Sequence, residues 1–229
     1  MKKILIFVCV LAVFLSCLAP MAYAQDYSSY VDLNCNIDYM ISLDNDSVVI
    51  SKNADKRAAP ASITKITTAL VVLQNCPDLN AVVTVSENAI ASLAGTGSSV
   101  AGLKAGEQMS VLNMLYCLLV PSGNDAAAAL AEYVAGSQEK FVEMMNQCVA
   151  ALGCKNTHFD NPHGLDSDTH YSTAEDIAII AKAALKYDEF KTIVSTARYT
   201  LPATNQNKER TLTNTNFMLN KVYVTYYRD

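Results

Sequence analysis

The sequence has no basic patch, no internal repeat and no low-complexity linker. Its 229 residues contain 17 lysines and arginines against 22 aspartates and glutamates, which gives a formal net charge of −5. Such mild acidity gives no support for nucleic-acid binding, so we expect no nucleic-acid partner. Beyond residue 24, no stretch is long and apolar enough to span a bilayer.

Cysteine is too scarce for a dense disulfide framework. Seven are present, and removal of the N-terminal segment described below leaves five. An odd count in an exported chain argues against a fully paired framework. Cys117 lies in an apolar run and is predicted to be a buried, small apolar residue. Cys148 and Cys154 could form a bridge or remain free thiols.

The N-terminus has the three parts of a secretory signal peptide. "MKK" is positively charged, the following run is apolar, and "AYA" at residues 22–24 is a small-x-small cleavage site. We expect cleavage after Ala24; an uncleaved anchor is the alternative, and Cys17 is a poor lipoprotein site. Residues 25–229 would then form one domain of 205 residues, with a net charge of −7 after loss of two lysines.

The rest of the chain alternates short strands with helices. Two strands are expected around a polar turn at residues 45–46, and another at residues 80–86. The segment 59–74 is predicted to be an amphipathic helix. Its apolar positions step by three and four, so one face should be buried. These positions are Ile63, Ile66, Leu70 and Leu73.

Capping residues delimit the later helices. Ser110 can cap a helix that Pro121 stops, and Gly136 can end the next one. Ser172 and Glu175 are predicted to form a capping box for residues 174–187. A strand pair, a helix-rich middle and a second β region indicate an α+β fold, not a doubly wound sheet.

Ser62 and Lys65 form the first candidate catalytic pair. Residues three apart on a helix face the same way, so a lysine that is neutral part of the time could take the serine's proton. The free N–H groups at a helix start would favour an oxyanion beside the serine. The alternative is that Ser62 caps the helix and Lys65 is solvated.

Ser122 and Asn124, in "VPSGND", form the second constellation. Two polar residues at i and i+2 of an extended link can point into one cleft. Ser122 could relay a proton to a leaving amine, and Asn124 could hold a substrate amide. The alternative is a helix cap at Asn124 or Asp125.

A metal site is the weaker hypothesis. Three histidines and three aspartates share one loop, but their spacings fit no metal motif, so we expect no metal and no other cofactor. These residues are His158, His163, His170, Asp160, Asp166 and Asp168. His163 is not expected to act as the base of a serine triad, because Lys65 already fills that role.

Together these motifs resemble those of the low-molecular-weight penicillin-binding proteins, the serine-type D-alanyl-D-alanine carboxypeptidases. "PASITKI" and "LLVPSGNDAA" match two family motifs, and "NPHGLD", "HYSTAEDIA" and "NTN" at residues 214–216 resemble further family segments. The resemblance runs from about Tyr39 to Asn216. It implies the β-lactamase/transpeptidase fold, an antiparallel sheet with helices plus a helix-rich lobe that holds "SGN".

The resemblance also implies an exported enzyme without cofactors, at the cell wall or the outer face of the cytoplasmic membrane. Ser62 would attack the penultimate D-alanine of a peptidoglycan stem peptide, with Lys65 as general base. Ser122 would help to protonate the departing D-alanine, and Asn124 would orient the peptide. β-Lactams would inhibit by acylating Ser62.

The third family motif, K-T-G, does not occur in the sequence. We therefore expect a catalytic domain that is incomplete at its C-terminus, lacks its C-terminal sheet strands and has little activity. Membrane contact would be confined to the signal segment or a missing C-terminal anchor.

Two other functions remain open at this point. A β-lactamase would share Ser62 and Lys65, but class A enzymes have S-D-N where this chain has S-G-N, and no convincing E-x-x-L-N segment is present. An inactive wall-binding protein is the other alternative.

Overall fold

The computed structural model describes residues 34–219, so the predicted signal segment lies outside the described residues. The described residues fall into two compact units, divided between Lys52 and Asn53. In the first unit, β1 (Asp38–Ile41) pairs antiparallel with β2 (Val48–Lys52), which confirms the predicted strand pair.

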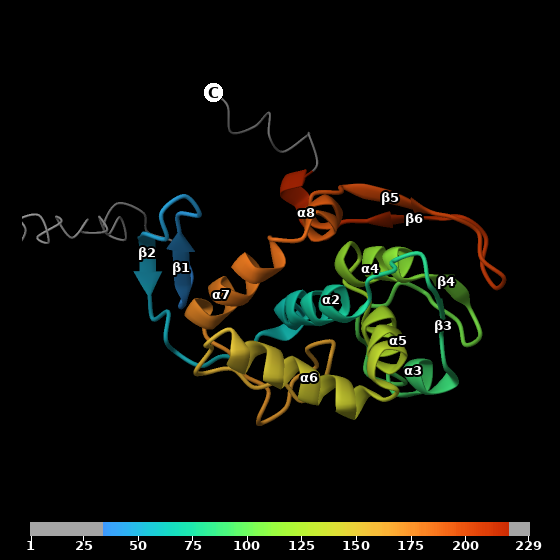
Figure 1. Ribbon diagram of the computed structural model, residues 1–229, viewed down its shortest axis with the longest axis horizontal. Coiled ribbons are helices and arrows are strands. Elements are labelled where there is room, and N and C mark those ends of the chain that lie inside the picture. The colour runs from blue at the N-terminus through green and yellow to red at the C-terminus, as the bar shows by residue number, and fades with distance from the viewer. Residues whose placement is uncertain (1–33, 220–229) are drawn as a thin grey trace, which may run out of the picture. The chain divides into compact units, whose positions relative to one another are not determined.

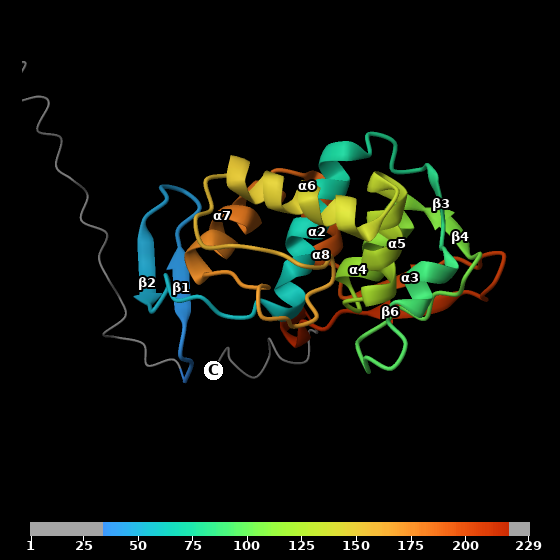
Figure 2. The same ribbon diagram turned by 90° about the horizontal axis from the view of Figure 1, so that it is seen from below.

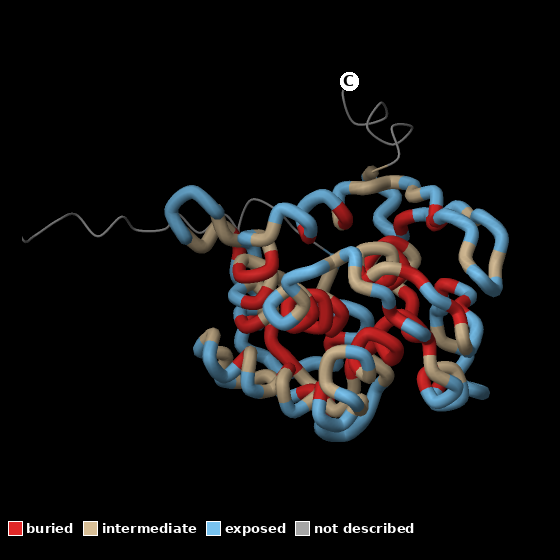
Figure 3. Tube along the Cα trace, turned by 45° about the vertical axis from the view of Figure 1, so that its right-hand side comes forward, coloured by how far each residue is buried: buried red, intermediate tan, exposed pale blue. Residues whose placement is uncertain are grey.

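The second unit is organised around one helix, α2 (Thr64–Asn75), which lies among four others in the views of Figure 1 and Figure 2. The neighbouring helices are α4 (Val111–Leu119), α5 (Asn124–Ala135), α6 (Gln138–Ala151) and α7 (Ala174–Ala184). The buried segments, red in Figure 3, gather in the middle of this unit.

The predicted buried face of this helix is only partly correct, since Leu70 is in the core and Ile66 and Leu73 pack against it but Ile63 does not. Ile63 is 48% exposed and precedes the α-helix proper, and Ile66 and Leu73 are only partly buried, although Leu70 is fully buried. Because α2 is surrounded, its buried residues are instead nearly continuous and include polar side chains. They are Thr64, Lys65, Thr67, Thr68, Ala69, Leu70, Val71 and Val72.

Two of the predicted helix ends are confirmed. The Ser110 side chain accepts a hydrogen bond from the Asn113 N–H at the start of α4. Gly136 ends α5 with a φ of 80°, in the left-handed conformation that glycine adopts without a Cβ clash.

The predicted capping box of Ser172 and Glu175 is wrong, because the N-cap of α7 is Thr173. The Thr173 hydroxyl, not Ser172, accepts from the Asp176 N–H. Asp176 is buried and its carboxylate accepts from the backbone N–H of Asn156 and the hydroxyl of Thr157. Pattern alone could not separate two adjacent hydroxyl residues, since the choice depends on these distant partners.

The remaining strands form two more antiparallel pairs. β3 (Val82–Thr84) pairs with β4 (Gln108–Ser110), and β5 (Arg198–Leu201) pairs with β6 (Arg210–Thr213). Within residues 34–219 no sheet has more than two strands. The short elements are α3 (Glu87–Ala91), α8 (Asp188–Val194) and the 3-10 turns η1 (Ala61–Ile63) and η2 (Phe217–Leu219). The α+β prediction is confirmed.

The β5–β6 hairpin is attached to α4 by aromatic stacking. The rings of Tyr116 and Tyr199 lie parallel with their centroids 3.6 Å apart, and the Tyr199 hydroxyl donates to the Asn113 Oδ1. This contact joins the C-terminal β region to the helical core.

The cysteines of the described part are free thiols. Cys117 is fully buried, as predicted. The Cys148 Sγ donates to Gln74 Oε1 and the Cys154 Sγ donates to the Asp176 carbonyl, so each thiol has its own partner. Among the helices that the structure describes, none is long and apolar enough to cross a membrane.

A buried carboxylate, Glu107, ties the β5–β6 connection to the core. It accepts from the Lys104 N–H at 3.0 Å, the Thr204 hydroxyl at 2.8 Å, Asn207 Nδ2 at 2.8 Å and Arg210 Nη1 at 3.0 Å. Burial alone would raise the pKa of Glu107, but these hydrogen bonds and the Arg210 charge outweigh it and hold the pKa below 4.5.

We expect Glu107→Gln to lower the free energy of unfolding by about 3 kcal/mol at pH 7, because it leaves the Arg210 guanidinium without its buried partner. Since the folded-state pKa is depressed, the carboxylate's contribution is present above pH 4.5 and is lost as the pH falls through the folded-state value. Urea unfolding of both proteins at pH 7 and at acidic pH measures this difference.

The matched control is Glu143→Gln on α6, which removes the same charge from an exposed position and should change stability little. Equal effects of the two substitutions at pH 7 would contradict the role given to Glu107.

Candidate active site

Ser62 and Lys65 meet where η1 passes into α2. The Lys65 Nζ donates to the Ser62 Oγ over 3.0 Å, so the predicted pair is brought together. Ser62 is exposed, whereas Lys65 is only 2% exposed, which excludes a solvated lysine. Neither η1 nor α2 has a side-chain cap, so the alternative that Ser62 caps the helix is wrong.

The Lys65 amine has a second hydrogen-bond acceptor. Its Nζ also donates to the carbonyl oxygen of His163 over 2.7 Å. Burial lowers the pKa of Lys65 from 10.5 to about 8, and the negative charge of Asp125 opposes part of that shift. A lysine with this pKa is neutral part of the time near physiological pH and can act as a base.

The backbone before Ser62 is strained. Ala61 has a φ of 47°, in the left-handed region that a residue with a Cβ rarely adopts. Gly164 lies directly against it, and a Cβ on Gly164 would approach the Ala61 carbonyl oxygen to 1.9 Å. Only glycine fits there, which gives a physical reason for the glycine in "NPHGLD".

The segment 157–173, named here the histidine loop, holds the start of α2 through three hydrogen bonds. Besides the bond from Lys65 to His163, the Thr68 hydroxyl donates to the Pro162 carbonyl over 2.5 Å, and Thr64 Oγ1 lies 2.8 Å from His170 Nε2. The sequence pattern of this loop suggested a metal site, which its spacings do not support, and a helix cap at its end. Its contact with α2 was missed, because it joins residues about a hundred positions apart.

An asparagine shapes the tip of this loop. The Asn161 Oδ1 accepts from the Gly164 N–H over 2.7 Å, and its Nδ2 donates to the Leu165 carbonyl over 2.7 Å. Such self-bonded turns present their remaining carbonyls in fixed directions. The His163 carbonyl that receives Lys65 lies inside this turn.

Ser122 and Asn124 lie at the start of α5. Ser122 has a φ of 62°, a second strained residue at a predicted site position. Gly123 is the N-cap, without a side-chain cap bond, so the capping alternative for Asn124 is wrong. Asn124 is 4% exposed, and its backbone N–H donates to the Ser99 carbonyl over 2.9 Å.

Asp125 connects this motif to the first one. Its carboxylate is buried, accepts from the N–H groups of Ala101, Leu103 and Ala126 at 2.9 Å each, and acts electrostatically on Lys65. The helix α5 that carries Asn124 and Asp125 also packs against α2. The helix that carries Asn124 therefore lies beside the helix that carries Lys65.

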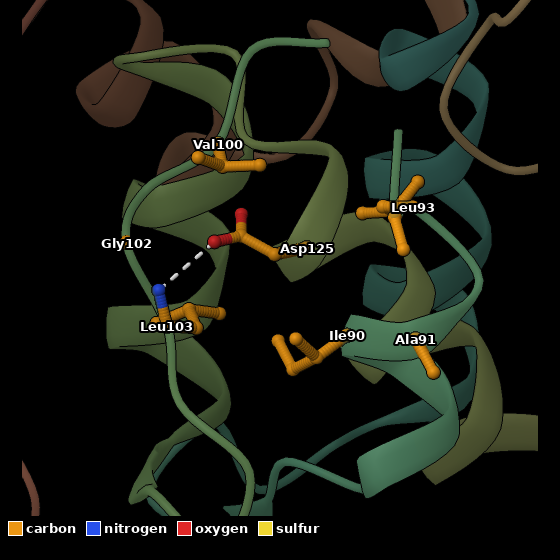
Figure 4. A pocket seen from close by; sticks show the side chains of 8 residues that line it. Ile90, Ala91, Leu93, Val100, Gly102, Leu103 and Asp125 are labelled. Carbon is orange, nitrogen blue, oxygen red and sulfur yellow. Dashed lines mark hydrogen bonds between the residues drawn. The ribbon is translucent and has the colours of Figure 1, made fainter. Parts of the chain in front are cut away.

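The pocket shown in Figure 4 is lined in part by Asp125. It has a volume of about 310 Å³ and is lined by α3, the segment 93–103 and Asp125. The dashed line marks the bond from the Leu103 N–H to Asp125. Its lining is mostly apolar and includes neither Ser62 nor Lys65, so it is separate from the serine–lysine pair.

The three histidines are dispersed within their loop. Among the described residues no group of three or more histidine, cysteine or acidic side chains is arranged to hold a metal ion. His163 is 7% exposed and its Nδ1 accepts from the Leu165 N–H, while burial and then the Lys65 charge lower its pKa to about 4. It contributes its carbonyl, not its ring, to the pair.

The chain is similar to curated enzymes over most of its length. It is 39% identical over 208 residues to the D-alanyl-D-alanine carboxypeptidase DacF of Bacillus subtilis, covering 88% of this chain and 52% of that protein. It is 40% identical over 179 residues to DacC of Escherichia coli, covering 75% and 45%. The chain thus spans about half the length of these relatives.

The solved structures confirm the fold. The Streptomyces K15 DD-transpeptidase matches with a TM-score of 0.77 and 32% identity, over 83% of this chain and 78% of that one. The DacD carboxypeptidase of Francisella tularensis matches with a TM-score of 0.71 and 32% identity, over 85% and 47%. The expected β-lactamase/transpeptidase fold is the fold of these neighbours.

A family model described as D-alanyl-D-alanine carboxypeptidase matches residues 27–227. With Ser62 and Lys65 in contact and the fold shared, the chain belongs to the D-alanyl-D-alanine carboxypeptidase family of serine peptidases.

Proposed function

We propose that the protein is a serine-type D-Ala-D-Ala carboxypeptidase that removes the terminal D-alanine from peptidoglycan stem peptides. The observation that carries this proposal is the 3.0 Å contact between the Lys65 Nζ and the exposed Ser62 Oγ. A buried lysine beside an exposed serine has the geometry of an activated nucleophile.

In the acylation step, neutral Lys65 accepts the Ser62 proton as the Oγ attacks the carbonyl carbon of the penultimate D-alanine. With a pKa of about 8, about a tenth of Lys65 is neutral at pH 7. A neutral amine keeps two N–H groups and one lone pair. One N–H stays on the His163 carbonyl, which leaves the lone pair free to face the serine.

Collapse of the tetrahedral intermediate breaks the peptide bond and needs a proton on the departing nitrogen. Ser122, held in its strained conformation before α5, is proposed to relay that proton from Lys65. Asn124 is proposed to orient the peptide through its side-chain amide. Water then hydrolyses the ester on Ser62 and releases the shortened peptide.

We also propose that the mature chain acts outside the cytoplasmic membrane, where its substrate is found. The support is the N-terminal signal sequence. N-terminal sequencing of the secreted protein should give Gln25 as the first residue.

β-Lactams, as analogues of the D-Ala-D-Ala end of the peptide, are proposed to acylate Ser62.

We expect a fluorescent penicillin to form a long-lived ester on Ser62. After trypsin digestion, mass spectrometry should place the label on residues 58–65, and Ser62→Ala should abolish it. Ser122→Ala serves as the comparison, because it should slow labelling but leave the label on Ser62. A label on residues 105–140, which contain Ser122, would show that Ser122 and not Ser62 is the nucleophile. Rapid hydrolysis of the label from Ser62 would favour a β-lactamase.

We expect the rate of this labelling to depend on the ionisation of Lys65. Below a pH of about 8 the neutral fraction falls about tenfold per pH unit, so the rate should rise with pH and level off above that value. Lys65→Arg cannot supply a neutral base and should be slower by roughly 10²–10⁴-fold. Stopped-flow fluorescence from pH 6 to 9 measures the profile.

The exposed Lys140→Arg is the control for charge and side-chain length, and it should follow the wild-type profile. A flat profile between pH 6 and 8, or fast labelling of Lys65→Arg, would exclude Lys65 as the base.

The 229 residues contain no lysine followed by Thr-Gly. We propose that a strand with this motif supplies two groups to the site: a second N–H for the oxyanion and a cation for the substrate carboxylate. We expect the chain extended through such a strand from a family member to release D-alanine at least about 10²-fold faster, the typical effect of one oxyanion donor. The assay is D-alanine release from a diacetylated lysyl-D-Ala-D-Ala peptide. The same extension carrying Ser62→Ala should be inactive, and equal turnover by the short chain would refute the role given to this segment.

A further inference from the structure

His170 is a buried imidazole that the proposed mechanism does not use. It is 2% exposed and its ring packs against Phe159, with the centroids 5.4 Å apart. Its Nε2 lies 2.8 Å from the Thr64 Oγ1, and its Nδ1 accepts the Asp160 N–H over 3.0 Å. Both ring nitrogens are therefore engaged, one with the histidine loop and one with α2.

These two contacts determine where the proton lies. A backbone N–H can only donate, so Nδ1 must present its lone pair to Asp160. A neutral imidazole then carries its hydrogen on Nε2, and Nε2 donates to the Thr64 hydroxyl. Burial lowers the pKa of His170, which favours this neutral form.

Thr64 is the residue through which His170 reaches the serine–lysine pair. It is fully buried, lies between Ser62 and Lys65 in the chain, and its backbone N–H donates to the carbonyls of Ala61 and Ser62. Its side chain therefore anchors the turn from which the Ser62 Oγ and the Lys65 Nζ both project.

The three bonds from α2 to the histidine loop differ in kind. Lys65 and Thr68 donate to main-chain carbonyls, which any residue could supply. The Thr64 bond alone among these three depends on the identity of a loop side chain and on its tautomer. Loss of that bond would release one side of the turn while the other two bonds remain.

We propose that His170 is a positioning residue for the acylation of Ser62: its Nε2–H holds the Thr64 hydroxyl and so fixes the turn that aligns the Lys65 Nζ with the Ser62 Oγ. This inference rests on the proposed function for its kinetic consequence. The tautomer and the alignment of Lys65 can be measured without turnover.

The test compares three substitutions in one helix. Thr64→Val keeps the shape and removes the hydroxyl, Thr64→Ser keeps the hydroxyl, and Thr67→Val is the matched control. Thr67 is equally buried, but its Oγ1 has no hydrogen-bond partner in the described part of the chain. All measurements are made well below the lowest unfolding temperature of the set.

The first readout is nuclear magnetic resonance of the imidazole nitrogens at pH 7, in a chain that has only three histidines. We expect His170 to be neutral with its hydrogen on Nε2. A hydrogen on Nδ1, or a charged ring, would overturn the proposal.

The second readout is the titration of Lys65 in protein carrying ¹³C at lysine Cε. Its pKa of about 8 sets it apart from ordinary lysines. In Thr64→Val we expect the pKa to rise by about half a unit or more, as a loosened turn admits water to the amine. Thr64→Ser and Thr67→Val should leave it unchanged; a Thr64→Val titration identical to that of Thr67→Val overturns the proposal.

The third readout is the penicillin labelling rate. We expect Thr64→Val to be slower by roughly tenfold to a hundredfold, a typical effect of a misplaced reacting group, and the other two variants to match the wild type. Equal rates in Thr64→Val and Thr67→Val overturn the positioning role. If wild-type Ser62 is not labelled, the proposed function fails. The Lys65 titration then tests the positioning role of His170 by itself.

Discussion

The burial of the Lys65 amine is the constraint on which the rest of the site depends. An ammonium group removed from water is strongly disfavoured unless it is hydrogen-bonded, and here it has one hydroxyl and one carbonyl as partners. The helix that carries it is enclosed by four others, and the histidine loop covers its first turns. Because burial disfavours the ammonium form, it also raises the fraction of Lys65 that is neutral.

The two motifs share a structural device. At each, a residue with a Cβ adopts a left-handed conformation, Ala61 with φ 47° and Ser122 with φ 62°. At each, a glycine permits a close approach: Gly164 to the Ala61 carbonyl, and Gly123 to the Cys117 carbonyl, where a Cβ would come within 2.7 Å. Each strained residue costs about 1–3 kcal/mol and persists only because the surrounding contacts determine its conformation.

Local pattern was sufficient for features that depend on neighbouring residues. The Ser110 cap, the Gly136 C-cap, the first strand pair and the contact between Ser62 and Lys65 all follow from spacings of a few residues. It failed where distant partners decide. The buried surface of α2 is wider than the predicted face, because threonine and lysine side chains are also buried there by bonds to residues 162–170.

The histidine loop was seen in the sequence but its role was not. Its histidines and aspartates suggested metal ligands, yet the contribution of His163 is a main-chain carbonyl that no side-chain pattern reveals. The buried Asp125 was likewise considered only as a cap. Its bonds to the N–H groups of Ala101 and Leu103 could not be inferred from a spacing of more than twenty residues.

The distance along the chain between Lys65 and His163, 98 positions, has a consequence for the order of events during synthesis. The serine and the lysine emerge together, but the carbonyl and the covering loop emerge much later. Without the docked loop, Lys65 lacks part of the burial that lowers its pKa in the folded chain. The burial of the amine therefore depends on a contact of large sequence separation, which closes only when residues far apart in the chain have come together.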